Sequence, residues 1–274
     1  MDIILLNKLK KAQMEIMDEV HRICELNDIK YYIIGGTALG AKRHGGFIPW
    51  DLDIDIAMPR VDYEKFSTVC EKELSDRFSY KSFKKEKKYT KFHALVCINN
   101  TFLSTKYSHL NPKEVNKGIY IDVFPLDKAP LDKALQVKQG EKLRKIKKMK
   151  EFRHGYSYSS VFYKRFIKKS ISRILFFISM DKLNEKYDRE SQRYSDSDSG
   201  LLCSMASHYR YEKQCMPEEI YGVPQLVKFE DRMYYAPEKL EEYLTRIYGD
   251  YMKLPPQKEI DANISAFSDV VFDN

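Results

Sequence analysis

Two carboxylates stand two residues apart in the segment Asp53-Ile54-Asp55-Ile56. In a strand, successive side chains point to opposite faces, so both aspartates would share one face and both isoleucines the other. Carboxylates held that close repel each other and raise each other's pKa, and a divalent cation relieves the repulsion. Oxygen ligands without a neighbouring Cys or His favour Mg²⁺ or Mn²⁺. The spacing therefore predicts a metal site at Asp53 and Asp55.

A third acid repeats the pattern further along the chain, where Asp122 stands between Ile121 and Val123. Apolar residues on both sides of an acid are typical of a strand with one functional side chain on its face. A third carboxylate beside a metal pair can bind an ion or take the proton from an attacking hydroxyl. We therefore expect Asp122 to be both a metal ligand and a catalytic residue, together with Asp53 and Asp55.

A glycine pair precedes these acids, in Gly35-Gly36-Thr37, where an apolar strand gives way to a helix. Backbone N–H groups are free at a helix start and the helix dipole favours anions there, so this turn is a candidate phosphate-binding site. The cations expected to assist it are three consecutive residues, Lys42, Arg43 and His44. A Gly-Gly pair is more often only a turn, so the phosphate-site prediction depends on the acids and cations that accompany it.

The surrounding pattern predicts an α+β order of elements. We expect helices over 6–26 and 37–43 and after a cap at Asp62, and strands over 31–34, 53–57, 92–98, 101–107 and 118–124. Pro59 and Pro125 are expected to end two of these strands, and the strands at 92–98 and 101–107 to form a hairpin. The expected core is a mixed β-sheet flanked by helices.

The positive charge of the chain is confined to one segment. Residues 128–175 hold fifteen Lys/Arg and three Asp/Glu, so this segment carries +12 and the rest of the chain −5. Helices are expected over 131–152 and 157–180, the second one amphipathic. One interpretation is a solvated basic face packed on the core, and the other is peripheral contact with an anionic membrane or glycan. No nucleic-acid-binding motif accompanies the charge, so we expect no nucleic acid partner.

These segments suggest three parts: a catalytic core over 1–127, a basic helical region over 128–200, and a C-terminal part over 201–274 that packs back on the core. The five cysteines form no C-x-x-C pair, and their odd number argues against a disulfide framework. No stretch approaches the ~18–20 apolar residues that span a bilayer. We expect a cytoplasmic protein, at the inner face of the membrane if the basic helices bind there.

Taken in order, the motifs G-G-[ST], D-h-D and h-D-h match the pattern of the nucleotidyltransferase-fold superfamily. The stretch from Gly35 to Arg60, GGTALGAKRHGGFIPWDLDIDIAMPR, closely resembles the signature of the LicD family. The segment GIYIDVFPLD at 118–127 and the block between Tyr243 and Pro256 resemble later parts of the same family. The three blocks stand in the family's order and bracket almost the whole chain.

The resemblance implies a metal-dependent phosphotransferase. LicD proteins are associated with moving phosphocholine from CDP-choline to a sugar of lipopolysaccharide, teichoic acid or a related, sometimes lipid-linked, glycan with release of CMP. Fukutin-type relatives use CDP-ribitol. By this resemblance Asp53 and Asp55 hold the metal, Asp122 is the base or a further ligand, and Asp51 supports them. The chain departs from the family at Leu52, where an aspartate is common, and at 257–261, where the family's usual basic and histidine residues are not evident.

Other functions remain open on the same fold. The donor could carry another polyol, as in CDP-glycerol, or the enzyme could attack the α-phosphate of a nucleotide and release pyrophosphate. A catalytically silent binding protein is a third alternative, and the joint presence of Asp53, Asp55 and Asp122 argues against it.

Overall fold

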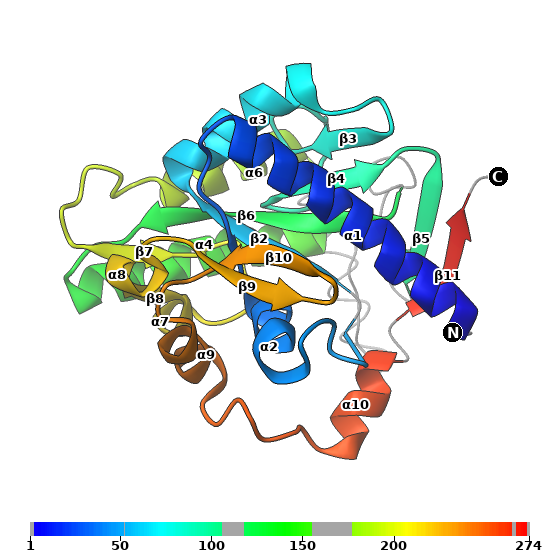
Figure 1. Cartoon of the computed structure of the whole chain (residues 1–274). Helices are drawn as coiled ribbons and strands as arrows, with labels where there is room; N and C mark the ends of the chain where they lie inside the picture. The colour runs from blue at the N-terminus through cyan, green and yellow to red at the C-terminus, as the bar shows by residue number, and fades with distance from the viewer. Residues whose placement is uncertain (1–2, 52, 106–117, 155–176, 265–266, 273–274) are drawn as a thin grey trace.

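The computed structural model describes residues 3–51, 53–105, 118–154, 177–264 and 267–272. Within these ranges the chain forms a mixed sheet with helices packed on it and two separate strand pairs (Figure 1). The expected α+β class is confirmed.

The helices are α1 Ile3–Leu26, α2 Gly35–His44, α3 Arg60–Glu73, α4 Lys133–His154, α6 Met180–Ser191, α7 Tyr211–Gln214, α8 Glu218–Tyr221, α9 Leu240–Tyr248 and α10 Gln257–Ile264. The strands are β1 Tyr32–Ile33, β2 Asp55–Pro59, β3 Phe78–Lys81, β4 Ala94–Ile98, β5 Thr101–Thr105, β6 Tyr120–Lys128, β7 Leu201–Cys203, β8 Cys215–Pro217, β9 Gln225–Phe229, β10 Arg232–Ala236 and β11 Phe267–Phe272.

The central sheet has the order β1-β2-β6-β4-β3, and β7 and β8 extend it beyond the end of β6. Strands β2 and β6 are parallel and their register places Asp55 opposite Asp122. The remaining neighbours in this sheet are antiparallel. A parallel pair needs a long connection, and here α3, β3 and β4 all lie between the two strands in sequence. The long connection thus brings two acids that are far apart in the chain to adjacent strands.

The two faces of β2 and β6 have different neighbours. Ile54, Ile56, Ile121 and Val123 are fully buried in the main hydrophobic core, to which α1 and α3 contribute their apolar faces. Figure 1 shows α1 crossing in front of the sheet and α4 on the far side. A second core cluster under α4 and α6 includes Leu143. Because side chains alternate along a strand, the acids point away from α1.

Several expected boundaries are wrong in an informative way. Strand β2 begins only at Asp55, so Asp53 lies in the segment before it. Pro59 is the last residue of β2, as expected, but Pro125 does not end its strand, because β6 continues to Lys128. Strand β4 pairs with β6 only as far as Val123. Pro125 therefore lies beyond that ladder, where the N–H that proline lacks is not required by β4.

Two further expectations are corrected by the pairing. Strand β5 pairs with β11 from the C-terminal end of the chain, so β4 and β5 do not form the expected hairpin. Asp62 is not a helix cap: α3 begins at Arg60, and the Asp62 carboxylate accepts the backbone N–H of Lys30. The first basic helix is confirmed as α4, whereas most of the second lies outside the described residues.

The C-terminal part contacts the sheet through β7, which pairs with the end of β6 at Asp127 and Lys128. Helix α9 buries Tyr243, Leu244 and Ile247. In the part of the chain that the structure describes, no helix is long and apolar enough to cross a membrane.

Candidate active site

The three expected acids converge at one place. Asp53, Asp55 and Asp122 each offer a carboxylate oxygen, and these oxygens lie within 4.8 Å of one another. The parallel register sets Asp55 beside Asp122, and the turn before β2 brings Asp53 to them. Asp122 is buried and the other two are partly exposed. The set contains oxygen ligands only, so it could hold a hard divalent ion.

Repulsion within this cluster shows in the ionisation of its members. Burial raises the pKa of Asp55 well above its usual range, and the charges of Asp122 and Asp51 raise it further. Burial and the neighbouring Asp51 act on Asp53 in the same direction. Three carboxylates this close are costly without a compensating cation, which is the physical reason that such a cluster suits a metal.

Asp122 differs because a lysine and a histidine already contact its carboxylate. Its Oδ1 lies 2.6 Å from Lys91 Nζ and 2.6 Å from His93 Nε2. An ionised carboxylate only accepts hydrogen bonds, so the imidazole must donate through Nε2–H. Burial alone would raise the pKa of Asp122, but Lys91 and His93 together keep it below the usual range. Burial lowers the pKa of His93 to about 4, so Lys91 is the cation of this trio at neutral pH.

The glycine turn lies directly beside the acids. Gly35 and Gly36 form the first turn of α2 rather than a loop before it. A Cβ atom on Gly36 would stand 2.2 Å from Asp51 Oδ2, so only glycine leaves room for that carboxylate. The N–H of Gly35 donates to the hydroxyl of Tyr243 at 3.0 Å. The start of α2 therefore already faces a carboxylate and a hydroxyl group in this state.

Thr37 has a structural contact to the acidic strand. Its Oγ1 accepts the backbone N–H of Asp55 at 2.8 Å, and the carbonyl of Asp55 accepts the N–H of Ile34 at 3.0 Å. These bonds lock the start of β2 against the start of α2. The motif G-G-T thus positions Asp51 and Asp55, independently of any phosphate that it binds.

The carboxylates open into a cavity of about 760 Å³, which we call the carboxylate cavity. Its other walls come from the segment before β4, from α4 and from the loop after β7. The aromatic rings on it include Phe92, Phe124 and Phe152, and lysines stand beside them. A concave site with apolar walls, converging acids and nearby cations is the arrangement expected of a binding or catalytic pocket.

Two inward-facing lysines of α4 shape that cavity. Lys150 Nζ donates to the carbonyl of Lys91 at 2.9 Å and also to the side chain of Asn184, and it lies 3.7 Å from the centre of the Phe92 ring. Lys147 Nζ donates to the carbonyls of Met205 and Ser207 at 3.0 and 2.6 Å. The basic helix is therefore not only a solvated surface, because it fixes the segments on both sides of the acids.

The expected phosphate-binding residues lie near the acids but do not line this cavity. Among the described residues the cavity wall includes none of Gly35, Gly36, Thr37, Lys42, Arg43 and His44. Lys42 pairs with Glu241 at 2.5 Å, and Arg43 donates to the carbonyl of Tyr251 at 2.8 Å. Both cations thus contact the C-terminal part of the chain from the far end of α2.

Aromatic residues stand close to the acids at another position. Tyr209 lies 6.0 Å from Tyr248, with the rings at right angles, and the hydroxyl of Tyr248 is near the start of α2. Tyr234 and Tyr235 are instead on β10, where the Tyr234 hydroxyl donates to Asp18.

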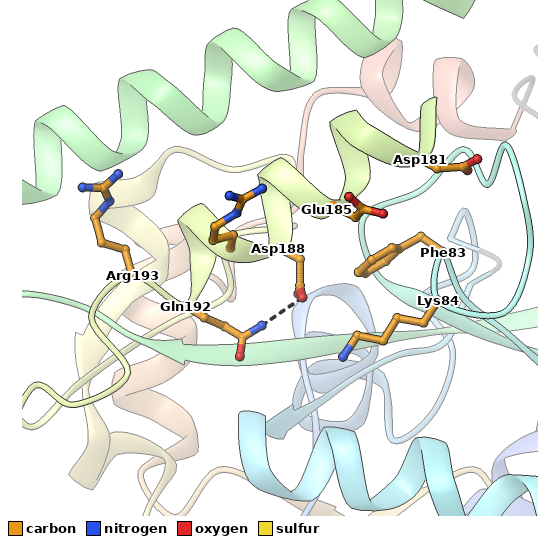
Figure 2. Close-up of a pocket in the computed structure, with 8 residues that line it drawn as sticks. Phe83, Lys84, Asp181, Glu185, Asp188, Gln192 and Arg193 are labelled. Atoms are coloured by element: carbon orange, nitrogen blue, oxygen red, sulfur yellow. Dashed lines mark hydrogen bonds between the residues drawn. The ribbon is translucent and has the colours of Figure 1, made fainter. Parts of the chain in front are cut away.

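A second cavity, of about 680 Å³, lies between α6 and the segment after β3 (Figure 2). Two of its charged groups already have partners: Asp188 accepts from Arg60 and from Gln192, and Lys84 pairs with Glu64. No cluster of metal-binding side chains occurs there within the described ranges. The carboxylate cavity is therefore the better candidate for chemistry.

The chain thus forms an α+β fold in which three carboxylates converge beside the parallel strands β2 and β6. Residues 28–132 match the LicD/FKTN/FKRP nucleotidyltransferase domain. That range includes the glycine turn, Asp53, Asp55, Lys91, His93 and Asp122.

Similarity to one curated relative extends over almost the whole chain. The lipopolysaccharide cholinephosphotransferase LicD of Haemophilus influenzae is 27% identical over 249 residues, which cover 90% of this chain and 91% of that protein. An uncharacterised Rickettsia prowazekii protein is 34% identical over 118 residues, covering 42% of this chain and 39% of that protein. The ribitol 5-phosphate transferase FKRP of Mus musculus is 26% identical over 115 residues, covering 42% of this chain and 20% of that protein. The homology supports a phosphoryl-transferring enzyme.

Proposed function

We propose that this chain transfers phosphocholine, or a similar alcohol phosphate, from a CDP-linked donor such as CDP-choline to a sugar hydroxyl of a cell-surface glycan precursor. The observation that supports this most is the convergence of Asp53, Asp55 and Asp122 in a cavity that also holds lysines. The full-length similarity to a cholinephosphotransferase favours choline over ribitol as the alcohol.

In the proposed reaction the acceptor oxygen forms a bond to the phosphorus that carries the alcohol. The bond from that phosphorus to the oxygen of the nucleoside monophosphate breaks, and CMP leaves with the bonding electrons. The three aspartates would hold Mg²⁺ or Mn²⁺, which when bound would neutralise phosphate charge and orient the diphosphate. Positioning and charge compensation are expected to supply most of the rate.

Asp122 is the proposed proton acceptor as well as a ligand. Lys91 and His93 both contact its Oδ1, and they make the carboxylate a weak base. Phosphoryl transfer has a loose transition state with little covalent chemistry for the protein to perform, so a weak base is sufficient. The two contacts also fix the orientation of the carboxylate toward the cavity.

The test is product analysis with CDP-choline and an acceptor glycan, in Mg²⁺ and in EDTA, for the parent and for Asp53→Asn. The proposal expects CMP and phosphocholine-modified glycan, both lost in EDTA and in the variant. Release of pyrophosphate from a nucleoside triphosphate would instead favour the alternative attack on the α-phosphate. Undiminished turnover in Asp53→Asn would remove the proposed metal site.

We further propose that the protein works in the cytoplasm at an anionic membrane surface. Helix α4 exposes Lys138 and Lys145, which do not line the carboxylate cavity, together with apolar Leu131 and Leu135 near its start. Cations beside exposed apolar side chains suit the interface of a membrane with acidic lipids. Co-sedimentation with vesicles containing acidic lipid, and not with neutral vesicles, is the expected result. Absence from both pellets would contradict the proposal.

A further inference from the structure

A third cavity, which we call the side cavity, adjoins the carboxylate cavity. It has a volume of about 490 Å³ and lies between α4 and the segment 204–212. Two side chains, Lys147 and His208, line both cavities. The two cavities therefore meet at these residues, and a ligand that fills both would pass beside them. Their position at the junction, next to the acids, is where a second phosphate group of a diphosphate would lie.

The side cavity offers groups for a neutral, polar ligand. It holds the cations Arg144 and Arg210 but also the carboxylates Glu141 and Glu212, so donors and acceptors both occur there. A third phosphate would meet repulsion from these carboxylates. A nucleoside, which presents amino, carbonyl and hydroxyl groups without charge, would not.

One polar side chain of the wall lacks a partner. The Oγ of Ser204 is buried, with the residue only 1% exposed, and it makes no hydrogen bond in the described part of the chain. A buried hydroxyl without a partner costs free energy, on the order of 1–3 kcal/mol, unless a ligand or water satisfies it. Its place on the wall of the side cavity makes a bound ligand the natural partner.

Aromatic residues complete the wall. Tyr209 and Tyr211 both line the side cavity, and the Tyr211 hydroxyl donates to Gln139 at 2.6 Å, which fixes the ring. Gly140 of α4 faces that ring, because a Cβ atom there would stand 3.3 Å from the side chain of Tyr211. Fixed aromatic rings are the usual platform on which nucleic-acid bases stack.

We propose that the side cavity binds the nucleoside of a nucleotide-linked donor, with Lys147 and His208 beside the phosphate that leaves with it. The inference rests on the proposed function, since it assigns one part of that donor to one part of the site. In an in-line transfer the leaving group and the acceptor lie on opposite sides of the phosphorus. With the nucleoside bound in the side cavity, the wider carboxylate cavity remains free for the acceptor.

The test uses a rim residue so that the fold is not disturbed. Val137 lines the side cavity but is 52% exposed, so Val137→Trp can close the cavity from its edge. Leu135, on the same helix and 37% exposed, does not line it, and Leu135→Trp is the matched control. Binding of CMP and of phosphocholine is measured by calorimetry with Mg²⁺, and the KM of the acceptor is measured by turnover.

The proposal expects Val137→Trp to weaken CMP binding by about tenfold, equivalent to 1.4 kcal/mol, while the control stays within about twofold of the parent. Phosphocholine binding and the acceptor KM should stay unchanged in both variants. An unchanged CMP affinity in Val137→Trp overturns the proposal, and a raised acceptor KM there would show that the side cavity holds the acceptor. If the parent itself binds no CMP but transfers phosphocholine from another donor, the CDP-linked donor and this subsite both fail.

Discussion

The ammonium group of Lys91 lies 2.6 Å from Oδ1 of Asp122, so a side chain of the protein already neutralises one acid of the cluster. Both residues are largely buried. Removal of one member of a buried pair leaves an uncompensated charge, which typically costs about 3–5 kcal/mol. An added divalent cation would supply the missing charge.

Lys91→Met is therefore expected to lower the free energy of unfolding by about 3 kcal/mol in EDTA and by clearly less in saturating Mg²⁺. Urea unfolding in the two conditions measures the difference. The control is Lys84→Met, which breaks a surface pair with Glu64 and should cost at most about 1 kcal/mol in both conditions. An equal loss for Lys91→Met with and without Mg²⁺ would argue against a metal beside Asp122.

Asp55→Asn tests the cluster from the opposite direction. Asp55 is repelled by Asp122 and Asp51, so the neutral amide should leave the metal-free protein at least as stable as the parent. The same change removes a ligand, and the increase in melting temperature that Mg²⁺ gives the parent should disappear. Asp62→Asn, in the first turn of α3, is the control and should keep the full Mg²⁺ response. A parent-like response in Asp55→Asn would exclude Asp55 as a ligand.

The glycine turn gives a prediction that separates activity from stability. An alanine at Gly36 would force Asp51 Oδ2 away from its position at 2.2 Å from the new Cβ atom. Gly36 has an ordinary backbone conformation, so Gly36→Ala should reduce turnover about tenfold or more while the melting temperature changes little.

Gly45→Ala is the matched control for that change. Gly45 has a φ of +70° and open space around its Cβ position, at the other end of α2. Alanine in that conformation strains the backbone, by about 1 kcal/mol, but touches nothing in the site. The control should lose stability and keep turnover. The reverse result, with Gly36→Ala active and Gly45→Ala inactive, would show that the start of α2 does not position the acids.

The closeness of the three acids could be predicted from the sequence because a strand pattern is local. Ile54 and Ile56 are buried as expected, and Asp55 and Asp122 lie on the opposite face. The strand bounds were less accurate, since Asp53 precedes β2 and reaches the cluster through a turn rather than through alternation. Side-chain alternation therefore accounts for Asp55 but not for Asp53, which lies before the strand.

The cations of the site were missed because their role depends on tertiary contacts. Lys91 and His93 stand two residues apart before β4, and this period-two spacing is the one local signal that could have indicated them. Lys147 and Lys150 are two lysines in a helix rich in lysine, and only their helical spacing from the apolar Leu143 distinguishes them from their exposed neighbours. Lys42, in contrast, is next to the glycine turn in sequence but pairs with Glu241 of α9.

Lys147 gives a prediction on pH. Burial lowers its pKa to about 8, so in the free protein the ammonium loses its proton as the pH rises through that value. A nucleotide phosphate favours the charged form and raises the pKa in the complex. CMP affinity in Mg²⁺ should therefore be nearly constant between about pH 7 and 8 and then fall, by at most about tenfold per pH unit, since one proton is involved. In Lys147→Arg the side chain stays charged over this range, and the affinity for CMP should not fall above pH 8.

Lys147→Met should bind CMP weakly at every pH. Calorimetric titrations of the three proteins from pH 7 to 9.5 decide the matter, because identical profiles for the parent and Lys147→Arg would mean that Lys147 does not contact the phosphate.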